Sequence, residues 1–289
     1  MVTRQDFEGQ ERPTWCRGCG NHAILNAIKM ALAEKTIAPH EALIVTGIGC
    51  GSKLPHYMKV TGFQGLHGRT VAVATGAHMA NHALRVMAVH GDGDGYGEGL
   101  AHFLNAARRN INIVDVVQDN RIYGLTKGQY SPTSEHGKHT PTSPEGSPDW
   151  PVQPLALAIT AGATFVSRGY SGELKHLAWL IGEALDHPGY ALVDVLQPCV
   201  SFNRGYAYEF YGPRVYKLEE EEDYDPADKA AAWERALEWG DRIPIGVFYR
   251  TEIPTYEDQV PALRTGPLVQ KPLTALQSQQ VKALQTEIM

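Results

Sequence analysis

Residues 85–129 have the sequence RVMAVHGDGDGYGEGLAHFLNAARRNINIVDVVQDNRIYGLTKGQ. An apolar stretch rich in β-branched residues leads into a glycine-rich turn, a segment of helical period and a second apolar stretch. This order is typical of a βαβ unit, in which a helix joins two parallel strands. A right-handed crossover brings the C-terminal ends of both strands to one edge of the sheet. We therefore expect Asp92 and Asn120, which follow the two strands, to meet at that edge.

The residues at this edge suit a cation and a phosphate group. A carboxylate and an amide oxygen are ligands for Mg²⁺, which completes its octahedron with phosphate oxygens and water. Glycines at 91, 93, 95, 97 and 99 let backbone N–H groups approach a diphosphate beside a helix N-terminus. The segment predicts a Mg²⁺–diphosphate site; the alternative is a glycine-rich turn without a ligand. The spacing matches neither G-x-G-x-x-G nor an EF-hand loop.

The rest of the chain continues the alternation of strands and helices, which predicts an α/β fold with a mostly parallel sheet flanked by helices. We expect strands at Ala42–Thr46, Arg85–His90, Asn112–Val117, Thr164–Ser167 and Ala191–Leu196. We expect helices at Asn21–Glu34, Gly76–His82, Gly97–Arg109, Leu155–Ala161, Gly172–Asp186 and Ala227–Trp239.

Two segments interrupt this pattern. Residues 130–154 are rich in Pro, Ser and Thr and predict a long ordered loop. After Asn203 the pattern loosens, and scattered prolines from Arg242 onward predict a tail. We therefore divide the chain into a cofactor-binding domain, residues 1–203, and a C-terminal extension, residues 204–289, that docks a partner.

Composition narrows the class of protein. The 289 residues carry 26 Lys and Arg against 32 Asp and Glu, a net charge of −6, and 43 % are apolar. Because no basic cluster is present, a dedicated nucleic-acid binder is not expected. No apolar run approaches the roughly 20 residues of a membrane helix, and the N-terminus lacks the apolar core of a signal peptide. We expect a cytoplasmic protein without a membrane partner.

The four cysteines suggest a second site. Cys16 and Cys19 form a C-x-x-C pair, while Cys50 and Cys199 stand alone. Buried core thiols and a four-thiolate metal site are both open interpretations. Zinc and iron–sulfur clusters each accept four thiolates, but a zinc ribbon normally has a second close pair. The wide spacing therefore favours a cluster assembled by the fold.

Several motifs together carry a family resemblance. They are WCRGCGNH, GIGCGSK, LHGR, ATGAHMAN, GDGDGYGEG, DNRIYGLTKGQYSPT and the late QPC. The GDG at 91–93 followed by Asn120 resembles the thiamine-diphosphate motif. The whole set, spanning Pro13 to Asn203, resembles the β subunit of the 2-oxoacid:ferredoxin oxidoreductases. One departure is Asp119, where thiamine enzymes commonly have Asn.

The resemblance implies a role for individual residues. A [4Fe–4S] cluster would be bound by Cys16, Cys19, Cys50 and Cys199. Magnesium would be bound by Asp92, Asn120 and the carbonyl of Ile122. Thiamine diphosphate would lie against Ile48, Gly49, Cys50, Gly51, His67, Arg69, Gly91, Gly93, Asp94, Gly124 and Leu125.

The resemblance also implies the reaction and the partners. A 2-oxoacid would be decarboxylated oxidatively with coenzyme A, and its electrons would pass through the cluster to ferredoxin; the reverse reaction also occurs in the family. The glutamate that activates the aminopyrimidine ring normally lies in a separate domain, for which this chain has no room. A larger α subunit, or α and γ subunits, would supply it.

We assign Lys53, His67 and Leu125 to the reacting centre, and we predict the substrate from Lys53. Lys53 follows the Cys50 turn, and an ammonium group there would favour a second carboxylate on the substrate. We therefore expect 2-oxoglutarate, with pyruvate as the alternative. Two other classes stay open: an electron-transfer module without carbon chemistry, and a non-oxidative thiamine-dependent decarboxylase with a structural zinc.

Overall fold

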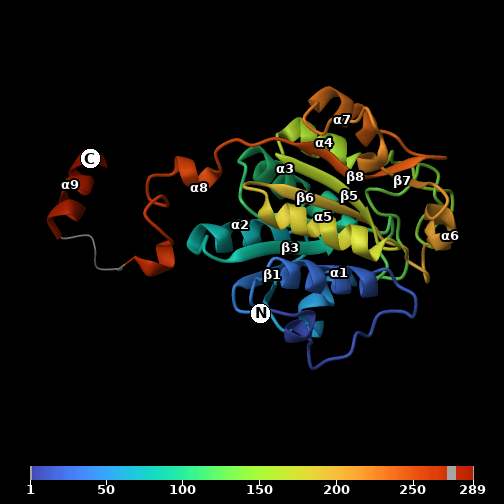
Figure 1. Cartoon of the computed structure of the whole chain (residues 1–289), viewed down its shortest axis with the longest axis horizontal. Helices are drawn as coiled ribbons and strands as arrows, with labels where there is room; N and C mark the ends of the chain where they lie inside the picture. Colours follow the sequence, from blue (N-terminus) through green and yellow to red (C-terminus); the bar gives the residue numbers. More distant parts are fainter. Residues whose placement is uncertain (1, 272–277, 289) are drawn as a thin grey trace.

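The computed structural model describes residues 2–271 and 278–288, and within them eight strands form one sheet in the order β2-β1-β3-β4-β6-β5-β8-β7 (Figure 1). The strands are β1 (Ala42–Thr46), β2 (Thr61–Gln64), β3 (Arg85–Gly91), β4 (Val114–Asp119), β5 (Phe165–Tyr170), β6 (Ala191–Leu196), β7 (Val215–Lys217) and β8 (Ile243–Arg250). Neighbouring strands from β2 to β5 pair in parallel, and β8 pairs antiparallel with β5. The expected α/β class is confirmed.

Helices cover both faces of this sheet. The α-helices among the described residues are α1 (Asn21–Glu34), α2 (Thr70–Ala80), α3 (Leu100–Arg108), α4 (Pro154–Ala161), α5 (Leu174–Asp186), α6 (Tyr208–Tyr211), α7 (Lys229–Ala236), α8 (Tyr256–Gln259) and α9 (Ser278–Ile288). Helices α1 and α5 pack together on one face, and α2, α3, α4 and α7 enclose the second core on the other. None of the helices within 2–271 and 278–288 is long and apolar enough to cross a membrane.

Local sequence explains the central elements. Ile24, Ile28 and Leu32 recur every four residues on α1 and are buried, so the helix presents one apolar stripe to the sheet. Every residue of β1, β4, β5 and β6 is buried, as expected for parallel strands covered on both faces. The expected ranges of α1, β1 and β6 match the structure at both ends. The other expected strands are each displaced or shorter by one to three residues at an end.

Three strands were not expected. The predicted tail from Arg242 onward is wrong for its first part, because Ile243–Arg250 forms the buried strand β8. Pro244 suggested irregular structure, since proline cannot donate a ladder hydrogen bond. It lies beyond the stretch that pairs with β5, where Gly246 is the last partner, so its missing N–H breaks no bond on that side. Strand β7 pairs with β8, while β2, exposed along its whole length, pairs with β1.

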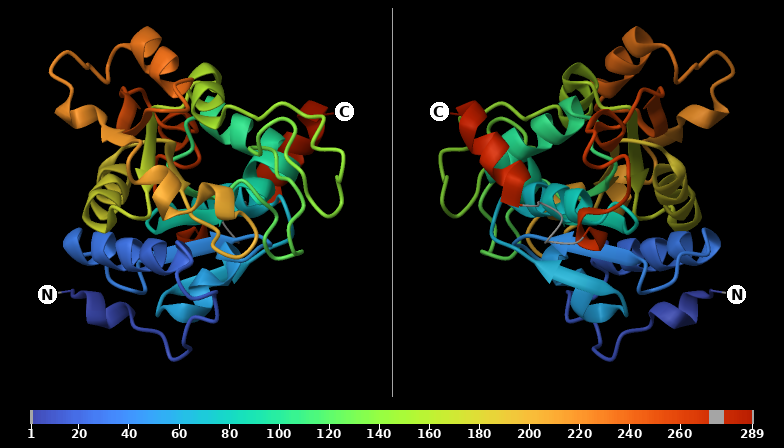
Figure 2. Two further views of the ribbon diagram at one scale, coloured as in Figure 1. Left: turned by 90° about the vertical axis from the view of Figure 1, so that its right-hand side faces the viewer. Right: turned by 90° about the vertical axis from the view of Figure 1, so that its left-hand side faces the viewer.

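The expected long loop is present. Between β4 and α4 the chain has short turns and isolated bridges, and Figure 2 shows this light-green segment looping outward from the body. Helix α2 begins at Thr70, six residues before the expected start. Its first turn is rich in β-branched residues, which weaken the helical signal.

Candidate active site

Four parallel strands end at one edge of the sheet. Strands β1, β3, β4 and β6 are neighbours in that order, so the segments that follow them meet at their C-terminal ends. These segments carry Cys50 after β1, Asp92 after β3, Asn120 after β4 and Cys199 after β6. In open parallel sheets this edge is where ligands bind.

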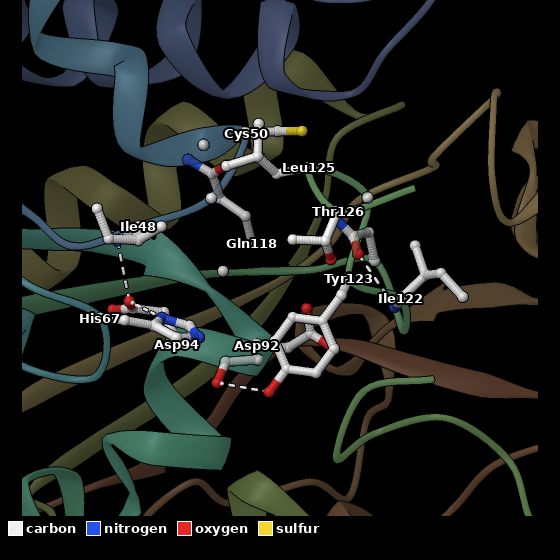
Figure 3. A pocket seen from close by; sticks show the side chains of 16 residues that line it. Ile48, Cys50, His67, Asp92, Asp94, Gln118, Ile122, Tyr123, Leu125 and Thr126 are labelled. Carbon is white, nitrogen blue, oxygen red and sulfur yellow. Dashed lines mark hydrogen bonds and ion pairs between the residues drawn. The ribbon is translucent and has the colours of Figure 1, made fainter. Parts of the chain in front are cut away.

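Asp92 and Asn120 line the same cavity. Gly91 on β3 is in register with Gln118 on β4, which places Asp92 and Asn120 at adjacent strand ends. The cavity has a volume of about 120 Å³. Its walls are formed by Ile48, Gly49, Cys50, Gly51, His67, Gly91, Asp92, Gly93, Asp94, Gln118, Asn120, Ile122, Tyr123, Gly124, Leu125 and Thr126. Figure 3 shows Cys50, Gln118 and Leu125 on one side and Asp92, Asp94 and His67 on the other.

The Asp92 carboxylate is held by the loop that follows β4. Its Oδ2 accepts hydrogen bonds from Ser131 Oγ at 2.5 Å and Thr133 Oγ1 at 2.7 Å. Thr133 Oγ1 also lies 2.7 Å from Asp119 Oδ1. Burial and the nearby Asp119 carboxylate raise the pKa of Asp92 to about 7. A divalent cation at this position would relieve the repulsion between these two carboxylates.

Asn120 is oriented by the chain around it. Its Oδ1 accepts a hydrogen bond from the backbone N–H of Ile122 at 3.1 Å, and its Nδ2 donates to Gln197 Oε1 at 2.8 Å. Arg121 between them has a φ of 59°, which folds the chain back so that Asn120 and Ile122 line one cavity. A carboxylate, an amide oxygen and a backbone carbonyl from these residues form the set of hard oxygen ligands that Mg²⁺ takes.

Asp94 organises the opposite wall. Its carboxylate accepts hydrogen bonds from Ile48 N at 3.0 Å, Gly68 N at 2.9 Å, Thr70 Oγ1 at 2.7 Å and His67 Nδ1 at 2.7 Å. Burial opposes the charge, but His90 and the backbone N–H of Ile48 lower the pKa of Asp94. Asp94 therefore fixes the loops after β1 and before α2 around the cavity.

The four cysteines surround a second cavity. It has a volume of about 170 Å³ and is lined by Thr14, Trp15, Cys16, Cys19, Asn21, Cys50, Lys53, Asn120, Gly124, Leu125, Gln197, Cys199, Val200, Ser201 and Phe202. None of the four forms a disulfide. Burial and the three neighbouring thiols raise the pKa of Cys19 to about 12. Across the described part of the chain, no three His, Cys, Asp or Glu side chains are grouped to hold a metal ion.

The two cavities share a wall. Cys50, Asn120, Gly124 and Leu125 line both of them. A Cβ atom placed on Gly124 would lie 3.6 Å from the sulfur of Cys199 and 3.8 Å from that of Cys50. Gly124 therefore lies between the cavity that contains Asp92 and the sulfurs of Cys50 and Cys199.

Two residues predicted for the cofactor and substrate do not line the first cavity. Lys53 is exposed and lines the cysteine cavity only. Arg69 lines neither cavity and contacts His102. The remaining predicted residues line one cavity or both.

Sequence reasoning missed several residues of the site. Gln118 is 1 % exposed, and neither atom of its amide has a hydrogen-bond partner among the described residues. A polar residue within the apolar stretch of β4 was the available signal. The side chains of Ser131 and Thr133, which hold Asp92, were also missed. So was Gln197, quoted only as part of a motif.

Family models match most of the chain. Residues 47–195 match "Thiamine pyrophosphate enzyme, C-terminal TPP binding domain", and residues 199–265 match the model for the C-terminal part of the pyruvate ferredoxin oxidoreductase beta subunit. The first range contains Asp92, Asn120 and Ile122, and the second contains Cys199.

Individual relatives agree with the family models. A 2-oxoacid:ferredoxin oxidoreductase subunit beta from Sulfolobus sp is 45 % identical over 86 % of this chain and 85 % of its own length. The 2-oxoglutarate oxidoreductase subunit KorB of Mycobacterium tuberculosis is 45 % identical over 70 % of this chain and 54 % of its own. A solved structure of 2-oxoglutarate:ferredoxin oxidoreductase from Magnetococcus marinus, with 2-oxoglutarate, coenzyme A and succinyl-CoA bound, superimposes with a TM-score of 0.91. It is 37 % identical and covers 98 % of this chain and 96 % of that one.

Proposed function

The chain belongs to the 2-oxoacid:ferredoxin oxidoreductases as a β subunit, and from this premise we propose its substrate, its cofactors and its partners. The proposed reaction converts 2-oxoglutarate and coenzyme A to succinyl-CoA and CO₂. It releases one proton and two electrons, and two molecules of ferredoxin each accept one electron. The observation that carries the proposal is the shared wall between a cavity with oxygen ligands and a cavity with four thiols.

The first cavity is proposed to hold the diphosphate and thiazolium end of thiamine diphosphate with its Mg²⁺. Asp92, Asn120 and the carbonyl of Ile122 would bind the metal. The buried, unpartnered amide of Gln118 supports a polar ligand in this cavity, because a buried amide without hydrogen bonds is costly. When bound, thiamine diphosphate supplies a carbanion for attack on the keto carbon and a sink for the electrons left by CO₂.

The second cavity is proposed to hold a [4Fe–4S] cluster on Cys16, Cys19, Cys50 and Cys199. A single zinc ion would draw all four sulfurs to about 2.3 Å. A cavity of about 170 Å³ among the thiols fits a larger group. The proposed location stays the cytoplasm, because four cysteines that serve as cluster ligands suit a compartment in which disulfides are rare.

A partner subunit is proposed to complete the first cavity. The side chains of Ile48 and Leu125 at its rim are 39 % and 48 % exposed. They offer an apolar surface to an α subunit, or to α and γ subunits, carrying the pyrimidine-activating glutamate. Ferredoxin is the proposed electron acceptor.

The substrate proposal rests on the relatives and on Lys53. The names of the KorB relative and of the Magnetococcus structure both include 2-oxoglutarate. Lys53 places a cation at the cysteine cavity, which shares Leu125 with the cofactor cavity. The ammonium group would pair with the distal carboxylate, which pyruvate lacks.

The test uses the complete complex with its partner subunits. We expect about four iron atoms per β subunit, and visible absorption that bleaches when 2-oxoglutarate and coenzyme A are added together. Colourless protein that contains zinc would reject the cluster. Bleaching without formation of succinyl-CoA when both 2-oxoglutarate and coenzyme A are present would reject the proposed reaction.

Substrate choice is tested with Lys53→Ile. The variant should raise the KM for 2-oxoglutarate about 10-fold, equivalent to roughly 1.4 kcal/mol, and leave that for pyruvate within about twofold. The matched control is Lys59→Ile, because Lys59 is exposed nearby but lines neither cavity. Equal changes in KM for both substrates in Lys53→Ile would show that the charge of Lys53 does not select the substrate.

A further inference from the structure

The side chain of Gln197 contacts one residue proposed for each centre, Asn120 and Cys19. It directly follows β6, and 1 % of its surface is exposed. Its Oε1 accepts a hydrogen bond from Asn120 Nδ2 at 2.8 Å. Its Nε2 donates to the carbonyl of Pro198 at 2.7 Å and to the sulfur of Cys19 at 3.4 Å.

The carbonyl of Pro198 fixes which way this amide points. A backbone carbonyl can only accept, so the nitrogen of Gln197 must face it. The oxygen of Gln197 must then face Asn120, and Asn120 must present its NH₂ group in return. This leaves Asn120 Oδ1 on the opposite side, where it accepts from Ile122 N at 3.1 Å and lines the first cavity.

We propose that Gln197 is a positioning residue that orients Asn120 for the metal and donates an N–H to the cluster ligand Cys19, so that one side chain adjusts both centres. This inference rests on the proposed function, because it assumes Mg²⁺ in the first cavity and an iron–sulfur cluster in the second.

The effect on the cluster follows from charge. Reduction adds negative charge to the cluster and its sulfur ligands, and an N–H donor stabilises that charge. Hydrogen bonds to sulfur are among the features that set cluster potentials. Removing the Gln197 donor should therefore shift the midpoint potential to a more negative value.

The effect on the metal follows from orientation. Without Gln197, Asn120 loses the acceptor for its NH₂ group and can turn that group toward the cation. Loss of a partner that orients a metal ligand typically weakens metal binding 10- to 100-fold.

Two variants separate the two contacts. Gln197→Glu keeps an oxygen that accepts from Asn120. Whether this carboxyl is ionised or protonated toward the Pro198 carbonyl, it has no hydrogen left for Cys19. Gln197→Leu removes both contacts. Asn203→Ala is the matched control, because Asn203 Nδ2 donates to the Asn120 carbonyl at 2.8 Å and its side chain has no hydrogen bond to a cysteine sulfur.

The experiment measures two quantities in the complete complex: the cluster midpoint potential, by a redox titration followed by electron paramagnetic resonance, and the Kd for Mg²⁺ in the presence of thiamine diphosphate. Gln197→Glu should lower the potential and leave the Kd within about threefold of wild type. Gln197→Leu should lower the potential and raise the Kd about 10- to 100-fold. Asn203→Ala should raise the Kd alone.

Two outcomes would overturn the role proposed for Gln197. An unchanged potential in Gln197→Glu, with the cluster fully present, would show that the contact with Cys19 has no role. An unchanged Kd in Gln197→Leu would show that Asn120 needs no partner. Wild-type complex without a cluster signal or Mg²⁺ binding would instead defeat the proposed function, which keeps the two failures apart.

Discussion

The indole nitrogen of Trp15 lies 2.6 Å from the carbonyl oxygen of Cys50, to which it donates a hydrogen bond. This bond joins the segment before α1 to the turn after β1. The indole also packs edge-on against Tyr57, with ring centroids 4.8 Å apart. Two of the segments that carry thiols are thereby held together by one side chain.

Trp15→Phe keeps an aromatic ring against Tyr57 but removes the hydrogen bond. We expect a loss of about 1 kcal/mol in the free energy of unfolding and a lower iron content per chain. Denaturant titration and iron analysis measure the two effects. Trp150→Phe serves as control, since Trp150 is 78 % exposed and stacks on His136 away from both cavities. An iron content equal to wild type in Trp15→Phe would mean that the bond does not help to hold the proposed cluster ligands.

Asp94→Asn should destabilise the protein even without cofactor. The carboxylate accepts hydrogen bonds from four donors, and an amide would turn its NH₂ group toward some of them. The expected loss is about 2–3 kcal/mol in the free energy of unfolding, because buried donors lose a charged acceptor. Urea titration without Mg²⁺ or thiamine diphosphate tests this, and a wild-type midpoint would contradict it.

Asp92→Asn, two residues away, should behave in the opposite way. Asp92 is buried beside Asp119, so neutralising it removes repulsion between carboxylates. Without cofactor we expect unchanged stability or a gain of about 1 kcal/mol. Thiamine diphosphate binding with Mg²⁺ should weaken at least about 100-fold, because a charged ligand is lost. Titration calorimetry on the complex tests the binding, and wild-type affinity would argue that the metal lies elsewhere.

Gly51 should tolerate a side chain only when Gln118 is shortened. A Cβ atom on Gly51 would lie 1.8 Å from Gln118 Oε1, far inside van der Waals contact. Gly51→Ala alone should cost about 1–3 kcal/mol through overpacking. In the double variant with Gln118→Ala, most of that cost should disappear, which a double-mutant cycle measures as a coupling energy. Additive effects would mean that Gln118 does not occupy the observed position.

Acid should weaken the fold through His187. Burial and the nearby Arg250 lower the pKa of His187 from its usual 6.5 to about 4. Its Nε2 donates to Thr164 Oγ1 at 2.8 Å, because that hydroxyl gives its proton to Asn110. The folded state thus favours the neutral ring, so its contribution is complete above pH 6.5 and is lost as the pH falls toward 4. The loss amounts to about 3 kcal/mol at most.

Urea titrations at several pH values test this slope. His187→Gln keeps a donor that can face Thr164 and should flatten the profile in that range, whereas the same change at the exposed His40 serves as control. A wild-type slope in His187→Gln would assign the acid sensitivity to other groups.

The sequence was sufficient where one physical signal was dominant. Strands β1 and β6 are short apolar runs buried on both faces, and α1 has an apolar stripe, so their limits could be predicted. Asp92 and Asn120 could be paired because the crossover rule brings adjacent strand ends together. The spacing of Cys16, Cys19, Cys50 and Cys199 left buried core thiols and a four-thiolate site both open, and the family resemblance favoured the single site.

Other features depend on contacts that no local pattern records. Strand β8 contains Pro244, and only the alignment with β5 shows that its missing N–H costs nothing there. Strand β2 is four exposed residues without alternation. The contacts of Gln197 join residues separated by 77 and 178 positions. Contacts between residues so far apart in the sequence form only when the sheet has assembled.

Strand β2 is the outermost strand at its end of the sheet, with β1 as its neighbour among the described residues. Phe63 on this strand is 51 % exposed and Leu66 just beyond it is 75 % exposed. An open edge beside apolar side chains is a template on which copies of a lone polypeptide can stack, which leads to aggregation. The β subunit produced alone should therefore be prone to aggregate through this edge.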